Sequence, residues 1–231
     1  MQKGCAAALE QLPQILYQDR RIVVCVKPAG VLSTDEPGGM PELLRCALGE
    51  ENGCVRVVHR LDRPVGGVMV YARSRAADAI LSQQAASGQL QKTYLAVVHG
   101  APPQQAELQD YLVRDRLQRR TRVAQTPEKD AQLARLHFRR VAVCGELSLL
   151  RIRLLTGRTH QIRTQLSHRA WPIYGDGKYG APEQTQALAL FSCALELSHP
   201  QSGERLRFAC NPPAIFPWSL FDACAFQENS L

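Results

Sequence analysis

A single carboxylate, Asp62, stands between two arginines in the stretch HRLDRPVGG, residues 59–67. A surface cluster of ion pairs has no need of the two glycines, and a core strand would not contain the charges. Proline and glycine let a chain turn tightly and come close to a substrate. A carboxylate held there could attack a substrate. The simpler interpretation is that Asp62 caps a turn and pairs with Arg60 or Arg63, because structural ion pairs are common.

Positive charge is densest in VRDRLQRRTRV, residues 113–123, which holds five arginines and one acid. Such runs usually form a solvated strand face or loop. The whole chain carries 28 Lys and Arg against 21 Asp and Glu, a formal net charge of +7, with a pI near 9.1. That excess suits a polyanion such as nucleic acid, although many soluble proteins are modestly basic.

The cysteines and histidines do not predict a metal site. None of the eight cysteines forms a C-x-x-C pair, and the six histidines show no clustered spacing. Cys25 lies in an apolar run, where cysteine acts as a small core residue. The N-terminus is too polar for a secretory signal, and no apolar run reaches membrane-spanning length. We therefore expect a cytoplasmic protein with reduced thiols, no membrane segment and no metal.

Strands and helices must position these residues. We expect strands over residues 21–30, 91–100 and 145–155, and two last strands over 187–200 and 203–213. In the third of these, Leu150, Ile152 and Leu154 alternate with Arg151 and Arg153, which is typical of a half-exposed strand.

Helices are expected over residues 39–53, 74–88 and 159–170. Ser74 would cap the second helix, in which a shared face is formed by Ala77, Ile80, Leu81 and Gln84. In the third, Ile162, Leu166 and Ala170 recur every four residues and predict one core face. With 45% hydrophobic residues and no linker, the chain is expected to form one mixed α/β (α+β) domain over residues 1–231, with largely antiparallel pairing.

Six segments in register resemble the RluA-type RNA pseudouridine synthases. These are YQDRRIVVCVKPAGVLS, HRLDRPVGGVMVYAR, KTYLAVVHG, TGRTHQIRTQL, PIYGDGKYG and LFSCALELSHP, and together they cover about residues 15–217. The resemblance implies a mixed sheet with a central active-site cleft, no cofactor, and conversion of uridine in RNA to pseudouridine. It implies RNA as the partner, either rRNA or tRNA, and we expect a monomer. Relatives often carry an N-terminal S4 domain, which we do not expect here because the first matching strand comes early.

The resemblance assigns catalytic roles to three residues. Asp62 would be the catalytic carboxylate, Arg163 would pair with it, and Tyr94 would stack on the target uracil. A glycosidase needs two carboxylates, whereas an isomerase that keeps its uracil can use one. Whether Asp62 attacks the sugar or the base, or assists elimination, stays open. A tyrosine in an apolar strand is otherwise most often a core residue.

The resemblance also suggests substrate contacts. Arg60 would support flipping of the target base, and Leu166 would line the base pocket or simply belong to the core. His160 would support the start of its helix or a phosphate. Phosphate contacts are expected from the basic run, through Arg119, Arg120 and Arg122. The segment GDGKYG would be a loop near the site or a solvated turn.

One motif departs from the family pattern. Val65, Gly66 and Gly67 stand where relatives usually read Thr-Ser-Gly, so two hydroxyl groups are missing. Their hydrogen bonds to the turn cannot form here, but the carboxylate is retained. An alternative function is an inactive RNA-binding protein on the same fold, which would not need Asp62, Tyr94 and Arg163 together. A nucleoside hydrolase is a weaker alternative function, because such an enzyme would need a second carboxylate or a bound metal.

Overall fold

The computed structural model describes residues 12–125, 128–183 and 187–226. Contacts divide the chain into two compact units. The first holds the residues up to Lys92 together with Ser192–Cys210, and the second holds Thr93–Phe191 together with the residues from Asn211 onward. The single catalytic domain expected over residues 1–231 stays a prediction.

The first unit is built on antiparallel strands around a buried strand, β4 (Gly66–Ala72). β2 (Ile22–Lys27) pairs with β4 on one side and with β1 (Gln14–Gln18) on the other. The short β3 (Arg56–Val57) also pairs with β4, and β10 (Leu190–Ser198) pairs with β11 (Arg205–Ala209). β10 follows β4 in the strand order.

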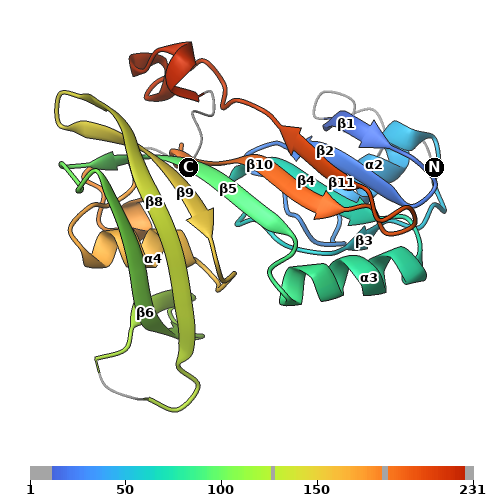
Figure 1. Cartoon of the computed structure of the whole chain (residues 1–231), viewed down its shortest axis with the longest axis horizontal. Helices are drawn as coiled ribbons and strands as arrows, with labels where there is room; N and C mark the ends of the chain where they lie inside the picture. Colours follow the sequence, from blue (N-terminus) through green and yellow to red (C-terminus); the bar gives the residue numbers. More distant parts are fainter. Residues whose placement is uncertain (1–11, 126–127, 184–186, 227–231) are drawn as a thin grey trace. The chain divides into compact units, whose positions relative to one another are not determined.

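Two helices belong to the described part of this unit. In α2 (Met40–Leu48), proline occupies the first turn and Gly49 ends the helix in the left-handed conformation, so the helix is shorter than the range 39–53 expected from the sequence. In α3 (Arg75–Ala86), the Ser74 hydroxyl accepts a hydrogen bond from the backbone of Ala77. Figure 1 shows α3 alongside the strands of this unit, and their apolar side chains form one core, which includes Val24, Val70, Leu81 and Leu195. Ile80 was predicted to share the buried face but is 40% exposed, because it lies at the edge of that face.

The second unit contains strands in the order β5-β9-β8-β6-β7, of which β6–β7, β6–β8 and β8–β9 pair antiparallel. Their bounds are β5 (Gln91–His99), β6 (Gln105–Asp115), β7 (Arg120–Val123), β8 (Gln132–Cys144) and β9 (Leu147–Leu154). One helix, α4 (Gln161–His168), and three short 3₁₀ turns accompany them: η2 (Gly177–Tyr179), η3 (Trp218–Leu220) and η4 (Ala223–Phe226). The units together give the mixed α+β, largely antiparallel fold that the sequence predicted.

Two details of the second unit differ from the sequence prediction. Arg151 is 2% exposed instead of facing water, because its guanidinium donates to the Phe226 carbonyl at 2.8 Å in the C-terminal segment. α4 ends at His168, and Ala170 follows it in a left-handed conformation. Every residue from Gln161 to Leu166 is buried, so the helix has no single core face.

None of the seven cysteines in the described part of the chain forms a disulfide, and Cys5 lies outside that part. The reduced state of the thiols stays a prediction.

Candidate active site

Asp62 lies in the connection between β3 and β4, within the first unit. Burial alternates along this segment: His59 and Leu61 are buried, Arg60 is exposed and Asp62 is half-buried. In extended backbone, residues two apart point to the same side. Arg60 and Asp62 therefore face outward together, and the buried neighbours anchor the segment from behind.

Backbone hydrogen bonds hold the Asp62 loop, which we define as residues 58–65. The Val65 N–H donates to the Asp62 carbonyl at 2.9 Å and closes a turn. This main-chain bond closes the turn without the two hydroxyl groups that the family pattern usually supplies. The loop is also tied to residues 28–33: the Gly30 N–H donates to the Arg63 carbonyl at 2.8 Å, and the Arg63 side chain donates to the Gly30 carbonyl at 2.8 Å.

A second tie runs through Ser33. Its hydroxyl donates to the Leu61 carbonyl at 3.0 Å, and its own carbonyl accepts from the buried Tyr71 hydroxyl at 3.0 Å. The peptide groups on both sides of Asp62 are thereby fixed to a neighbouring loop and to β4.

Gly67 explains why the motif HRLDRPVGG ends in glycine. Its φ is +126°, and a Cβ placed there would lie 2.3 Å from the carbonyl oxygen of Ser192 in β10. Only glycine permits both this conformation and this close approach. The glycine thus lets β4 pair closely with its neighbour directly after the Asp62 loop.

Lys27 is a residue of this site that the sequence analysis did not single out. It ends β2, is 0% exposed, and donates from Nζ to the carbonyls of Pro28, Val31 and Arg63 at 2.8, 2.6 and 3.1 Å. Burial lowers its pKa to about 8, while the nearby Asp62 carboxylate opposes that shift. A lysine inside an apolar strand, directly before Pro28, was the available signal.

His59 anchors the same loop as a neutral residue. Its Nε2 accepts the Val70 backbone N–H at 3.3 Å in β4. Burial lowers the pKa of His59 to about 3, with a further contribution from the charge of Lys92. An imidazole of such low pKa stays uncharged at neutral pH, so His59 positions the loop and does not supply a charge.

Arg163 and Tyr94 both belong to the second unit. Arg163 in α4 forms a bidentate ion pair with Asp176: Nε to Oδ2 is 2.7 Å and Nη2 to Oδ1 is 2.8 Å, and both side chains are buried. Asp176, in the GDGKYG segment, was not singled out from the sequence. Tyr94 is 5% exposed in β5. The meeting of these residues with Asp62 stays a prediction.

Tyr179 connects three parts of the second unit. Its hydroxyl accepts the Thr121 backbone N–H at 2.8 Å from β7 and lies 2.7 Å from His160 Nδ1 at the start of α4. The guanidinium carbons of Arg120 and Arg163 each lie 5.0 Å from the centre of its ring. GDGKYG is therefore a structural junction. His160, in a left-handed conformation, supports the helix start, one of the two roles expected for it.

Leu166 is 0% exposed in α4, as its core interpretation requires, and its place in a base pocket stays a prediction.

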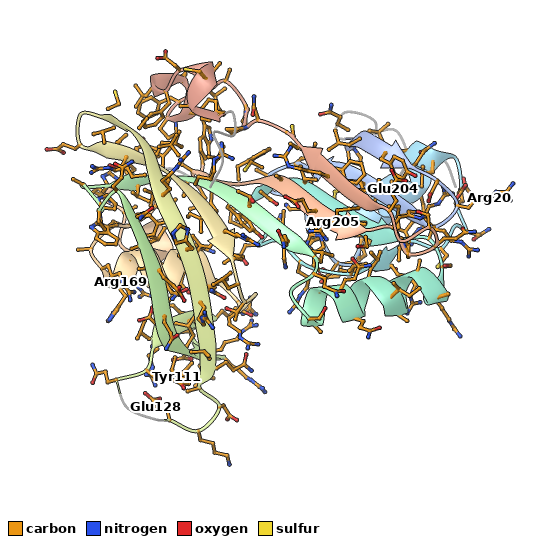
Figure 2. The ribbon with its side chains drawn as sticks, in the orientation of Figure 1. Arg20, Tyr111, Glu128, Arg169, Glu204 and Arg205 are labelled. Atoms are coloured by element: carbon orange, nitrogen blue, oxygen red, sulfur yellow. The ribbon has the colours of Figure 1, made fainter. Side chains whose placement is uncertain are left out.

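The basic run forms the β6–β7 hairpin, in which the arginines differ. Arg119 is exposed in a left-handed turn, whereas Arg122 is held by Glu128 through two contacts of 2.8 and 2.6 Å (Glu128 is labelled in Figure 2). Arg122 is thus the least available of the three to a phosphate.

Within residues 12–125, 128–183 and 187–226, no group of three or more His, Cys, Asp and Glu side chains is placed to hold a metal ion. Among the same residues, no helix has the length and apolar character needed to cross a membrane.

Comparison with known proteins identifies the family. The sequence profile described as RNA pseudouridylate synthase matches residues 21–168, which is more than half of the chain. The chain belongs to this family. Asp62, Tyr94 and Arg163 all lie within the matched segment.

Individual relatives carry related names. The chain is 37% identical to an uncharacterized RNA pseudouridine synthase of Chloroflexus aurantiacus, with 81% of this chain and 62% of the relative covered. It is 33% identical to the tRNA pseudouridine synthase C of Pectobacterium carotovorum (89% and 60%), and 34% identical to the ribosomal large subunit pseudouridine synthase D of Xanthomonas campestris (90% and 68%). The chain thus spans about six-tenths of the length of the first two relatives.

The fold is shared with solved structures. The human RNA pseudouridylate synthase domain containing 4 superposes with a TM-score of 0.78 at 24% identity, covering 94% of this chain and 95% of that one.

Proposed function

We propose that this protein converts specific uridines of structured RNA to pseudouridine, with Asp62 as the catalytic carboxylate. The observation that carries the proposal is the display of Asp62. Within a segment matched to the family, a half-buried carboxylate faces outward from a loop whose backbone is tied on both sides. Such preorganisation costs no rearrangement at the moment of reaction.

The reaction exchanges one bond of the sugar for another. The C1′–N1 bond of uridine breaks, the uracil turns while held in the pocket, and a C1′–C5 bond forms. N1 gains a proton and C5 loses one, so no water, oxidant or cofactor is consumed. One carboxylate suffices, because the leaving base is kept and reattached. In our proposal Asp62 acts on the sugar or on the base, Arg163 stabilises the carboxylate, and Tyr94 stacks on the uracil.

Arg60 is proposed to occupy space vacated by a flipped base. A stacked uridine cannot react, and unstacking costs a few kcal/mol. Arg60 is exposed on the same outward side as Asp62. Its planar guanidinium can stack on neighbouring bases and bond their edges.

RNA affinity is proposed to come from the β6–β7 hairpin, chiefly Arg119 and Arg120, with His160 and Leu166 completing the substrate contacts. Phosphate contacts of this kind supply affinity without sequence information. We further propose a cytoplasmic, monomeric enzyme that acts without a metal.

The target is proposed to be tRNA or rRNA, because relatives are named for each of these RNA classes. Deleting the gene in its host and mapping pseudouridine across both RNA pools identifies the uridine. Purified protein should restore the same modification on RNA from the deletion strain, and the Asp62→Asn variant should not. Binding of that RNA by the wild-type protein without any pseudouridine formed would instead support the inactive RNA-binding alternative.

A further inference from the structure

Two cysteines meet across the β10–β11 hairpin of the first unit, whose strands Figure 1 shows side by side. Cys193 lies in β10, and Cys210 directly follows β11. The register pairs Ala194 with Ala209, so the next pair toward the open end of the hairpin is Cys193 with Cys210. The Cys210 N–H donates to the Cys193 carbonyl at 2.9 Å, which confirms that the two residues lie directly opposite each other.

Both side chains project from the same face of the hairpin. Alternation along β10 places Cys193 on the side of Leu195 and Leu197, which both belong to the core of the first unit. Cys210 packs against the same core, as does Phe208 two residues before it. The two thiols are therefore neighbours on the core side of adjacent strands.

The spacing of such a pair permits a disulfide, but with strain. The Cα atoms of a hydrogen-bonded antiparallel pair lie about 5.5 Å apart, within the range of roughly 4.4–6.8 Å found in disulfides. The Cβ atoms of directly opposite residues lie about 4.5–5.5 Å apart, whereas disulfides prefer roughly 3.5–4.5 Å. The two strands must therefore approach each other slightly when the bond forms. Strained disulfides are the ones that are reduced most readily, so this geometry suits a reversible bond.

The two cysteines differ in exposure. Cys193 is 5% exposed and Cys210 is half-buried, so a reagent in solution reaches Cys210 first. Burial raises the pKa of the Cys210 thiol, which keeps it protonated at neutral pH and favours the reduced pair until an oxidant is in excess. A cysteine in an apolar strand commonly serves as a small core residue. That role accounts for Cys193, but it does not require a second, partly exposed cysteine opposite it.

We propose that Cys193 and Cys210 form a reversible redox modification site that takes a low-molecular-weight disulfide as its oxidant. The Cys210 thiolate attacks one sulfur of the small disulfide, so that a mixed disulfide forms and one small thiol leaves. The Cys193 thiol then loses its proton and attacks the Cys210 sulfur, and the second small thiol leaves. The two protein thiols lose two electrons and two protons, and the small disulfide becomes two thiols. The site does not depend on the proposed role of Asp62.

The bond would clasp the open end of the hairpin. The chain enters this part of the first unit at Ser192 and leaves it at Cys210, so both cysteines lie where the two strands begin and end. A bond there closes a loop around the hairpin, which restricts the unfolded chain and should stabilise the first unit. Strain in the bond offsets part of that gain. We therefore expect the thermal unfolding midpoint to rise by only a few degrees on oxidation.

The test treats the full chain, first reduced and desalted, with an excess of oxidised glutathione at neutral pH. Remaining thiols are blocked with iodoacetamide, and peptides are mapped by mass spectrometry before and after dithiothreitol. We expect a link between Cys193 and Cys210 that dithiothreitol removes. Cys193→Ala should instead retain glutathione on Cys210, because the thiol that displaces it is gone.

The control variant is Cys224→Ala, which removes an exposed thiol in the same C-terminal part of the chain. It should form the link and gain the same rise in unfolding midpoint as the wild type. Cys210→Ala should form no link from Cys193 and should show no rise on oxidation. Circular dichroism reports whether each oxidised protein keeps its fold.

The proposal is overturned if the folded wild type forms no link between Cys193 and Cys210 in excess oxidised glutathione. A midpoint that falls on oxidation also overturns it, because the bond would then distort the hairpin. The same holds if Cys210→Ala gains the wild-type rise in midpoint. If Cys193→Ala does not fold, the wild-type link and the comparison of Cys210→Ala with Cys224→Ala decide.

Discussion

The Asp62 loop and the α4 region are held in different ways. The loop is tied through backbone groups: the carbonyls of Leu61, Asp62 and Arg63 all accept hydrogen bonds. α4 is tied through side chains, with Arg163 on Asp176 and His160 on Tyr179. These ties to the loop use backbone carbonyls and not the proposed catalytic carboxylate, whereas the side chains of Arg163 and His160 are themselves part of the packing of the second unit.

This difference teaches how each substitution should be interpreted. A change of the Asp62 side chain leaves these backbone ties in place, so lost activity in a variant shown to be folded reports chemistry. A change of Arg163 removes structure as well as charge, so lost activity alone does not establish a catalytic role. The predictions below test this contrast, beginning with the largest expected effect.

Arg163→Ala should lower the free energy of unfolding by about 3–5 kcal/mol, because it leaves the buried Asp176 carboxylate without its partner. Urea unfolding measures the loss. The matched control is Arg169→Ala, which breaks a pair with Asp110 in which the arginine side chain is 26% exposed, against 7% for Arg163. A smaller loss is expected there because water can reach the pair. Equal losses in both variants would contradict the special weight given to the buried pair.

Gly67→Ala should destabilise the first unit by about 2–4 kcal/mol, from the strain of a positive φ and the clash with Ser192. Thermal unfolding checks this. Gly88→Ala is the control, since Gly88 also has a positive φ, of +75°, but a Cβ there meets nothing within 4 Å. If the two variants unfold at the same temperature, the close approach to Ser192 has no energetic weight.

Tyr179→Phe should cost about 1–3 kcal/mol, because the buried N–H of Thr121 loses its acceptor and His160 loses its partner. Chemical denaturation is again the measurement. Tyr17→Phe serves as the control, because its hydroxyl bonds the partly exposed Asp19 and its removal should cost less than about 0.5 kcal/mol. If Tyr179→Phe leaves the free energy of unfolding unchanged, the Tyr179 hydroxyl does not stabilise the second unit as proposed.

The smallest effect concerns the basic hairpin. Arg119→Ala should reduce the slope of log K against log salt by about one phosphate contact, whereas Arg122→Ala should leave it nearly unchanged because Glu128 already holds that guanidinium. RNA binding measured at several salt concentrations distinguishes them. An equal reduction for both would mean that RNA displaces Glu128.

The sequence predicted the local features well. The Ser74 cap and the strands near residues 21–30, 91–100, 145–155, 187–200 and 203–213 follow from patterns within a few residues, whereas the long strands β6 and β8 were not predicted. Lys27, Asp176 and Tyr179 did not emerge, because their partners are distant in the chain: Lys27 and Arg63 are 36 residues apart, and Thr121 and Tyr179 are 58 apart. The buried Arg151 was missed for the same reason, since Phe226 lies 75 residues away.

The central claim is that the Asp62 carboxylate carries the chemistry and not the fold or the RNA affinity. The most direct test measures Asp62→Asn on one stem-loop RNA for three quantities: the single-turnover rate, the dissociation constant and the unfolding midpoint. We expect no detectable pseudouridine, an affinity within a few-fold of the wild type, and an unchanged midpoint, since the backbone ties remain and arginines carry the binding. Measurable pseudouridine formation by this folded variant would contradict the account.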